Sequence, residues 1–232
     1  MKTGGDEICY LLQLEDGSEW RYLVDIQRPQ QATAHNHENH PAWTRLGFQQ
    51  CDNCPYQESE VVYCPAALDF AGIAQHFANT ASITRADVWV HSRERSYFKN
   101  TDMQNILRSL FGLLMATGAC PVLSRLKPLA ESHLPFASLQ ETVQRMVGTY
   151  LIRQYLKQQD AEGDPDWQLQ GLRALFREIK TVNLALMRRI RQASQDDANI
   201  NAIQGFISIS SIVEMGVDDI IHKMSSSLRQ GM

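Results

Sequence analysis

Four cysteines have the spacing and neighbours of a metal or iron–sulfur ligand set. Cys51 and Cys54 form a Cys-x2-Cys motif, Cys64 follows after nine residues, and Cys120 comes much later in the chain. Two cysteines separated by two residues can turn both sulfurs toward one ion or cluster, and two more from distant segments close a four-thiolate shell. Because thiolates are soft ligands, this set selects zinc or an iron–sulfur cluster over magnesium or calcium.

Proline follows three of these cysteines, at Pro55, Pro65 and Pro121. Proline there removes one backbone N–H and fixes φ, which stiffens the turn and can start the next helix. Cys-Pro steps occur in bacterial ferredoxin motifs, whereas structural zinc knuckles tend to have Gly after the second cysteine. The pattern favours a [4Fe–4S] cluster, with Zn2+ as the alternative and inert reduced thiols as the remaining interpretation. A thioredoxin-like dithiol is less favoured because this region lacks a βαβ setting.

Other residues near the motif have ordinary interpretations beside the chemical one. His40 is a possible substitute ligand in a Cys3His site, whereas His35 and His37 read as part of a solvated loop. His133 follows Cys120 by thirteen residues and either packs near the same site or bonds a backbone carbonyl at a helix end. Cys9 lies in an apolar strand pattern and reads as a small core residue. Four aromatic residues could shield a cluster or simply pack in the core: Trp43, Phe48, Tyr56 and Tyr63.

The elements that must position these residues change character along the chain. Alternating apolar residues over 8–26, with a turn at Asp16-Gly17, predict a β-hairpin, and a second hairpin is predicted around 87–91 and 96–99. Residues 27–40 read as a polar loop. Helical periodicity begins after Thr101, which forms a capping box with Gln104. A second capping box predicts a helix over 138–160, and two further apolar stripes cover 169–190 and 203–224.

These elements predict an α+β fold, with a small antiparallel hairpin sheet packed on a mainly helical bundle. Residues 1–100 would carry the sheet and the cysteine-rich segment 40–70, and residues 101–232 the bundle, as one integrated domain. Asn183 interrupts an apolar stripe. It is either bonded locally at the stripe edge or pairs with its symmetry mate in a homodimer through the helical region.

Composition excludes several classes of protein. The chain has 232 residues, 44% hydrophobic content and a net charge of −4, which argues against disorder and against a dedicated nucleic-acid binder. We expect no apolar stretch to reach the length of about 20 residues that spans a bilayer, and the N-terminus does not read as a signal peptide. We therefore expect a cytoplasmic protein with reduced thiols and no membrane contact.

The motifs together resemble a known grouping. His40-Pro41-x-Trp43, Cys51-x2-Cys54-Pro55, Cys64-Pro65 and Cys120-Pro121, with His133-Leu134-Pro135 beyond them, look like an uncharacterised bacterial family of similar length. The resemblance covers nearly the whole chain and implies that all three Cys-Pro steps belong to the pattern. It implies no activity.

Three functions follow from these observations. The first is a cytosolic iron–sulfur protein with a redox- or oxygen-responsive regulatory role, acting through a protein partner. The alternative is a zinc-stapled protein-interaction module without a redox role. The third is a metal- or thiolate-dependent enzyme of unknown substrate, which is less favoured because the chain has no P-loop, GxGxxG, HExxH or GxSxG motif.

Overall fold

A four-stranded antiparallel sheet forms the N-terminal side of the fold. The computed structural model describes residues 5–230, except for the side chains of residues 227 and 228. The strands, in the spatial order β2-β1-β3-β4, are β1 (Glu7–Leu14), β2 (Glu19–Asp25), β3 (Arg85–His91) and β4 (Ser96–Asp102). Both predicted hairpins are confirmed. Gly17, in the first turn, has a φ of 83°, a conformation that glycine adopts without steric cost.

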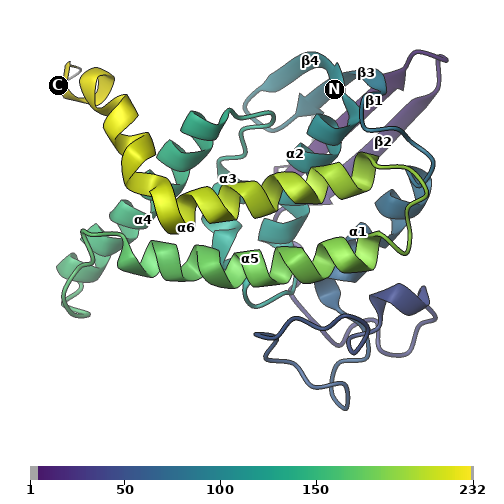
Figure 1. The fold of residues 1–232 in the computed structure, drawn as a ribbon, viewed down its shortest axis with the longest axis horizontal. Helices are drawn as coiled ribbons and strands as arrows, with labels where there is room; N and C mark the ends of the chain where they lie inside the picture. Colours follow the sequence, from purple (N-terminus) through teal and green to yellow (C-terminus); the bar gives the residue numbers. More distant parts are fainter. Residues whose placement is uncertain (1–4, 231–232) are drawn as a thin grey trace.

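The helices cover one side of this sheet (Figure 1). In chain order they are α1 (Pro65–His76), α2 (Met103–Thr117), α3 (Lys127–Glu131), α4 (Leu139–Gln159), α5 (Gln170–Ile190) and α6 (Ala198–Gln230), with short 3-10 helices η1 (Ala42–Thr44) and η2 (Leu123–Leu126). The α+β fold class is therefore confirmed. The buried residues of the sheet and of the helices form one continuous core.

The two predicted capping boxes have different outcomes. In α4, Ser138 and Glu141 form the full reciprocal box, as predicted. The predicted box at Thr101 is wrong, because β4 continues to Asp102 in the sheet ladder. Asp102 caps α2 instead, accepting a hydrogen bond from the backbone N–H of Asn105 at 3.0 Å.

Helices α5 and α6 run antiparallel across the face shown in Figure 1, and α6 bends away from α5 near its C-terminal end. The bend lies at Gly216, whose φ of −137° is not helical. A window within Ala198–Ser226 is long and apolar enough to cross a membrane by length and composition, so the expectation of no such stretch does not hold. The core helix of a soluble protein passes the same test, and the inner face of α6 buries Ile203, Val213 and Val217.

Asn183 lies inside this helix pair. It is buried, and its side-chain amide donates to Ser210 Oγ of α6 at 3.4 Å. This bond is made within one chain and inside the helix pair, so the stripe-edge interpretation is wrong. A homodimer through the helical region stays a prediction.

The cysteine loop, defined here as residues 27–64, connects β2 to α1 and lies below α1 and α5 in Figure 1. Apart from η1 and an isolated β-bridge between Arg45 and Tyr63, it consists of turns and irregular backbone. The predicted loop over 27–40 is confirmed. Three of the four candidate ligands come from this segment.

Candidate metal centre

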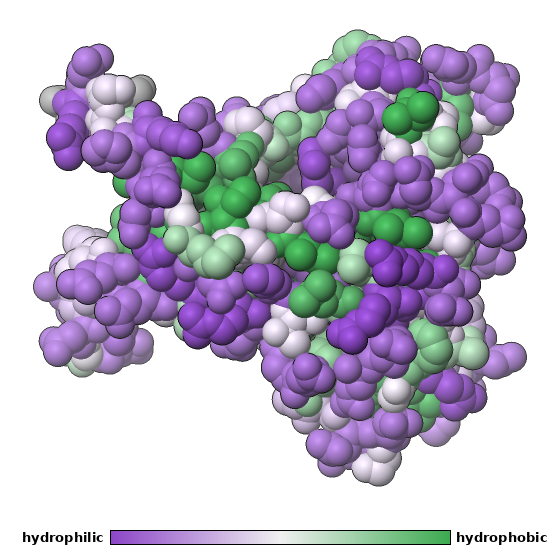
Figure 2. Space-filling model, in the orientation of Figure 1, coloured by the Kyte–Doolittle hydropathy of each residue, from purple (hydrophilic) through white to green (hydrophobic). Residues whose placement is uncertain are grey.

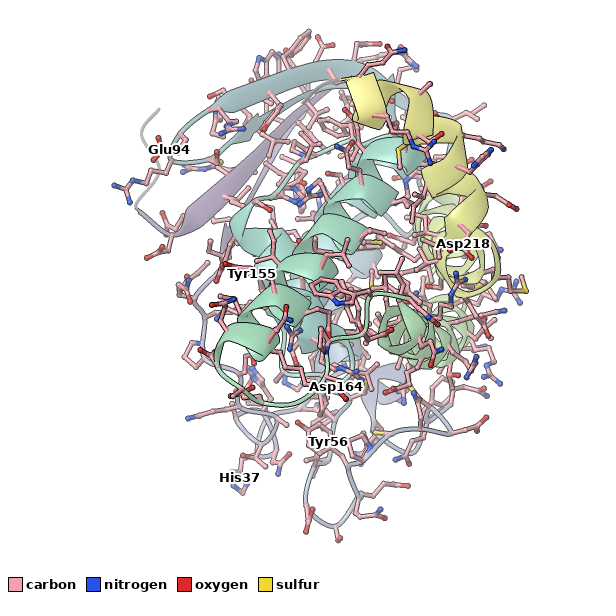
Figure 3. All side chains as sticks on the ribbon, turned by 90° about the vertical axis from the view of Figure 1, so that its left-hand side faces the viewer. His37, Tyr56, Glu94, Tyr155, Asp164 and Asp218 are labelled. Atoms are coloured by element: carbon pink, nitrogen blue, oxygen red, sulfur yellow. The ribbon has the colours of Figure 1, made fainter. Side chains whose placement is uncertain are left out.

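A tight turn brings Cys51 and Cys54 together in the cysteine loop. The backbone N–H of Cys54 donates to the carbonyl of Cys51 at 3.0 Å. The turn is tied to α5 because the Asn53 side chain donates to the carbonyl of Glu178 at 3.1 Å. Both cysteines are half-buried. Figure 3 shows the same loop at the bottom of the molecule, where Tyr56 and His37 are labelled.

Cys64 and Cys120 each precede the first turn of a helix. Cys64 is the N-cap of α1, with Pro65 at the first helical position, and its own N–H donates to the carbonyl of Thr44 at 2.8 Å. The thiol faces the N–H groups of Ala66 and Ala67. Cys120 repeats this arrangement before η2, where the N–H groups of Leu123 and Val122 face its thiol. Backbone N–H groups aimed at sulfur stabilise a thiolate over a thiol.

The four thiols lie within electrostatic reach of one another. Burial is the largest cause that raises the pKa of Cys51 to about 12, and the thiols of Cys64, Cys120 and Cys54 raise it further. Burial likewise raises the pKa of Cys120 to about 11, with added contributions from Cys64 and Cys54. Without a bound cation the thiols of Cys51 and Cys120 therefore stay protonated at neutral pH. A nucleophilic cysteine needs the opposite, a lowered pKa.

The thiols are not gathered around a single point. Among the residues that the structure describes, no three of the cysteine sulfurs lie within 4.8 Å of one another. All five cysteines are free of disulfide bonds. The arrangement is thus a set of neighbouring thiols that couple electrostatically, and it is not a closed site for one ion.

A buried arginine lies beside the thiols. Arg189 of α5 is 1% exposed and donates to three backbone carbonyls of the cysteine loop, those of Trp43, Arg45 and Leu46, at 2.9, 2.6 and 2.7 Å. Its charge lowers the pKa of the Cys51 and Cys64 thiols, against the larger effect of burial. Within residues 5–230, no carboxylate forms an ion pair with it.

Arg189 was not among the residues singled out from the sequence. The signal that could have found it is its place in the helix, since it lies three residues after Leu186 and falls on the apolar stripe of α5. A cation on an apolar stripe indicates a buried partner.

The other predicted residues lie apart from the thiols. His40 forms a group with His35 and Glu38 in the cysteine loop, and in the described part of the chain no group of three within 4.8 Å combines His40 with cysteines. His133 bonds neither a carbonyl nor the cysteine region with its side chain, because its Nε2 atom lies 2.7 Å from the hydroxyl of Tyr10 in β1. Cys9 is buried in β1, as expected.

The aromatic residues near the motif differ in what they contact. The Tyr56 hydroxyl donates to the carbonyl of Ala119 at 3.0 Å, so it joins the Cys-x2-Cys turn to the residue before Cys120. Tyr63 is buried and donates to the carbonyl of Glu38 at 3.1 Å. Trp43 packs against the core, half-buried, and Phe48 is also half-buried.

The comparisons with known proteins agree with the resemblance seen in the motifs. A family described as Domain of unknown function (DUF6901) matches residues 8–229. No curated protein and no solved structure matches the chain. The family match gives no activity, but it spans nearly every element described above, including the four cysteines and Arg189. The chain therefore belongs to the DUF6901 family.

Proposed function

We propose that Cys51, Cys54, Cys64 and Cys120 bind an iron–sulfur cluster of the [4Fe–4S] type and that the protein is a redox- or oxygen-responsive regulator. The observation that carries this proposal is Arg189, a buried cation whose charge acts on the thiols of Cys51 and Cys64 and whose hydrogen-bond partners are neutral carbonyls. A buried charge is expected to have a compensating charge nearby. A thiolate-bound cluster supplies that negative charge, whereas four protonated thiols do not.

The spacing of the thiols supports a cluster over a single ion. A tetrahedral zinc site with Zn–S bonds of about 2.3 Å needs sulfurs about 3.8 Å apart. A four-iron cluster binds each cysteine to a different iron, so the sulfurs lie wider apart, at roughly 6 Å. Among the described residues no three cysteine sulfurs lie within 4.8 Å of one another, so the thiols do not form the compact set that a zinc ion needs.

The regulatory part of the proposal rests on where the ligands come from. They lie in the cysteine loop, at the start of α1 and after α2, and Asn53 and Arg189 tie the same loop to α5. Loss of the cluster would remove the link among these segments, and a protein partner could detect the released loop. We place the proposed partner contact on α4, because Ile152, Tyr155 and Leu156 are exposed there at helical spacing (Tyr155 is labelled in Figure 3).

The test is the iron, sulfide and zinc content of the full chain purified without oxygen, with a visible absorption spectrum. We expect about four iron and four sulfide per chain, lost in Cys64→Ser and kept in the control Cys9→Ser, whose cysteine is also buried but lies in β1. Protein with no iron, no sulfide and no sulfur-to-iron absorption would contradict the proposal. Exposure to air should then make residues 27–64 more sensitive to limited proteolysis.

A zinc staple is the second candidate. It is favoured by the Cys-x2-Cys turn and by the N–H groups directed at Cys64 and Cys120, because structural zinc sites join separate segments in the same way. The same measurement separates the two. One zinc per chain without sulfide, unaffected by air, would assign a structural role and move the search for function to the helical surfaces.

A further inference from the structure

A polar cavity lies between the cysteine loop, α1 and the end of α2. Its volume is about 390 Å3, and its lining includes Tyr22, Arg28, His35, His40, Asp69 and Gly118. Arg28 is fully engaged, since it pairs with both oxygens of Asp69 at 2.6 and 2.9 Å and donates to the carbonyls of Leu114 and Thr117. The charges of Arg28 and Asp69 on this side of the cavity therefore neutralise each other. The nitrogen lone pairs that could bind a ligand belong to the histidines on the opposite side, His35 and His40.

His35, Glu38 and His40 lie on that side with their ligand atoms within 4.8 Å of one another. One carboxylate oxygen of Glu38 is 3.0 Å from His35 Nδ1, and the other is 3.2 Å from His40 Nε2. Each imidazole thus offers one nitrogen to the same carboxylate. Among the residues that the structure describes, this is the one group of three His, Cys, Asp or Glu residues drawn so close together.

The backbone that carries these residues is anchored. The Asn36 side chain donates to the carbonyl of Glu60 at 2.8 Å and accepts from the N–H of Val62 at 3.0 Å. The His40 ring packs edge-on against Tyr63, whose hydroxyl bonds the carbonyl of Glu38. The backbone of this segment and the His40 ring are therefore held by contacts outside the group, as the ligands of a metal usually are.

His40 also carries an unsatisfied atom. Its Nε2 is buried, and the approach to Glu38 does not have the geometry of a hydrogen bond. A buried polar atom without a partner is uncommon in a native structure and calls for an explanation such as an ion. A solvated His–Glu ion pair on the surface would not leave this atom buried and unpaired.

We propose that His35, Glu38 and His40 bind a divalent transition-metal ion, such as zinc or iron(II), at the wall of this cavity. Two imidazoles and one carboxylate are a preferred ligand set for these ions. Three protein ligands leave coordination positions open, and the cavity provides room there for water or a small polar ligand. The site shares no ligand with the four cysteines, so the inference does not depend on the proposed cluster.

Cobalt(II) titration of the full chain tests this inference, because the absorption spectrum of bound cobalt depends on the ligands that hold it. Binding through thiolates gives intense charge-transfer absorption, whereas binding through imidazole and carboxylate gives only weak bands. We expect one cobalt per chain without thiolate absorption, weakened about tenfold or more in His40→Ala and in Glu38→Gln. The matched control is His37→Ala, since His37 is an exposed histidine of the same loop outside the group.

The variants and the control make the outcomes decisive. Glu38 is 54% exposed, so Glu38→Gln leaves folding intact even if His40→Ala does not. Equal cobalt affinity in wild type, Glu38→Gln and His40→Ala would overturn the inference, as would an equal loss in His37→Ala. Failure of the cluster proposal appears separately, as absent iron and sulfide. Cobalt bound by the free thiols would then add charge-transfer absorption, while the weaker cobalt site would still be lost in Glu38→Gln and in His40→Ala.

Discussion

Residues 27–64 carry three of the thiols and contact α5 of the α5–α6 pair, but different interactions hold the loop and the helix pair in place. The helix pair buries apolar stripes, including Leu186, Ile203 and Val213, and its surface in Figure 2 shows apolar patches along α6 and the seam with α5. The cysteine loop buries few apolar side chains and is held by bonds from side chains to backbone groups. Apolar burial is non-directional, whereas these bonds each depend on one partner. A single substitution that removes one of these bonds should therefore destabilise the loop strongly, because few apolar contacts remain to hold it.

The largest effect is expected at Arg189, where the two regions meet. Arg189→Ala leaves three buried carbonyls of the loop without donors and opens a cavity in α5. We expect a loss of about 3–5 kcal/mol in the free energy of unfolding, together with loss of any bound metal. Chemical denaturation monitored by circular dichroism measures it. The control is Arg188→Ala, because Arg188 is exposed, and an equal loss in both variants would contradict the role of Arg189.

The second-largest effect is expected from substitution of Gly118, after α2, because it disturbs another contact that holds the loop. A Cβ atom there would lie 2.2 Å from Asp69 Oδ2 and 3.2 Å from Arg28 Nη2, so Gly118→Ala must displace the ion pair that joins the loop to α1. We expect a loss of about 2–4 kcal/mol.

The control for Gly118→Ala is Gly72→Ala in α1. A Cβ atom at Gly72 meets nothing within 4 Å. Alanine there should be neutral or stabilising by up to about 1 kcal/mol. Urea midpoints of the two variants give the comparison, and similar midpoints would show that the ion pair adapts freely.

The same contrast explains what sequence could predict. Periodicity depends on neighbours three or four residues away, so α4, α5 and both hairpins were predicted with nearly correct ends. The stripe over 203–224 lies well inside the longer α6, and α3 was not predicted. The N-cap of α2 was missed because the β4 ladder, a non-local pairing with β3, decides where the strand ends. The partners of Arg189 lie more than 140 residues earlier in the chain, and no local pattern encodes them. The metal content of the cysteine set stays a prediction.

The helical part of the molecule also contains a polar side chain, that of His133, which makes the stability of the protein depend on pH. His133 lies half-buried in the segment between α3 and α4, and desolvation lowers its pKa to about 3. Its unfolded-state pKa is near 6.5, so between these values only the unfolded chain takes up the proton, and stability falls as pH falls. The loss should be roughly 1.4 kcal/mol per pH unit, or about 2 kcal/mol at pH 5.

The substitution His133→Gln isolates this contribution from that of the carboxylates. Unfolding free energies of wild type and His133→Gln, measured between pH 7 and about pH 4, should converge as the pH falls. Parallel curves would show that His133 does not titrate on unfolding. Because the Tyr10 hydroxyl lies 2.7 Å from His133 Nε2, Tyr10→Phe should lower stability at neutral pH as well.

The smallest effect is expected at the capping box of α4, where the interacting residues are only three positions apart in the sequence. At the start of α4, Ser138 Oγ accepts from the N–H of Glu141 at 3.3 Å, and the Glu141 carboxylate accepts from the N–H of Ser138 at 2.7 Å. Ser138→Ala should cost about 1 kcal/mol, because one helix N–H loses its acceptor while water remains close by. Glu141→Gln keeps the reciprocal bond and should cost less. Thermal unfolding of both variants tests this order, and because α4 lies outside the thiol region, neither should alter metal content. A change in metal content would mean that the loop and the bundle are more tightly coupled than their contacts indicate.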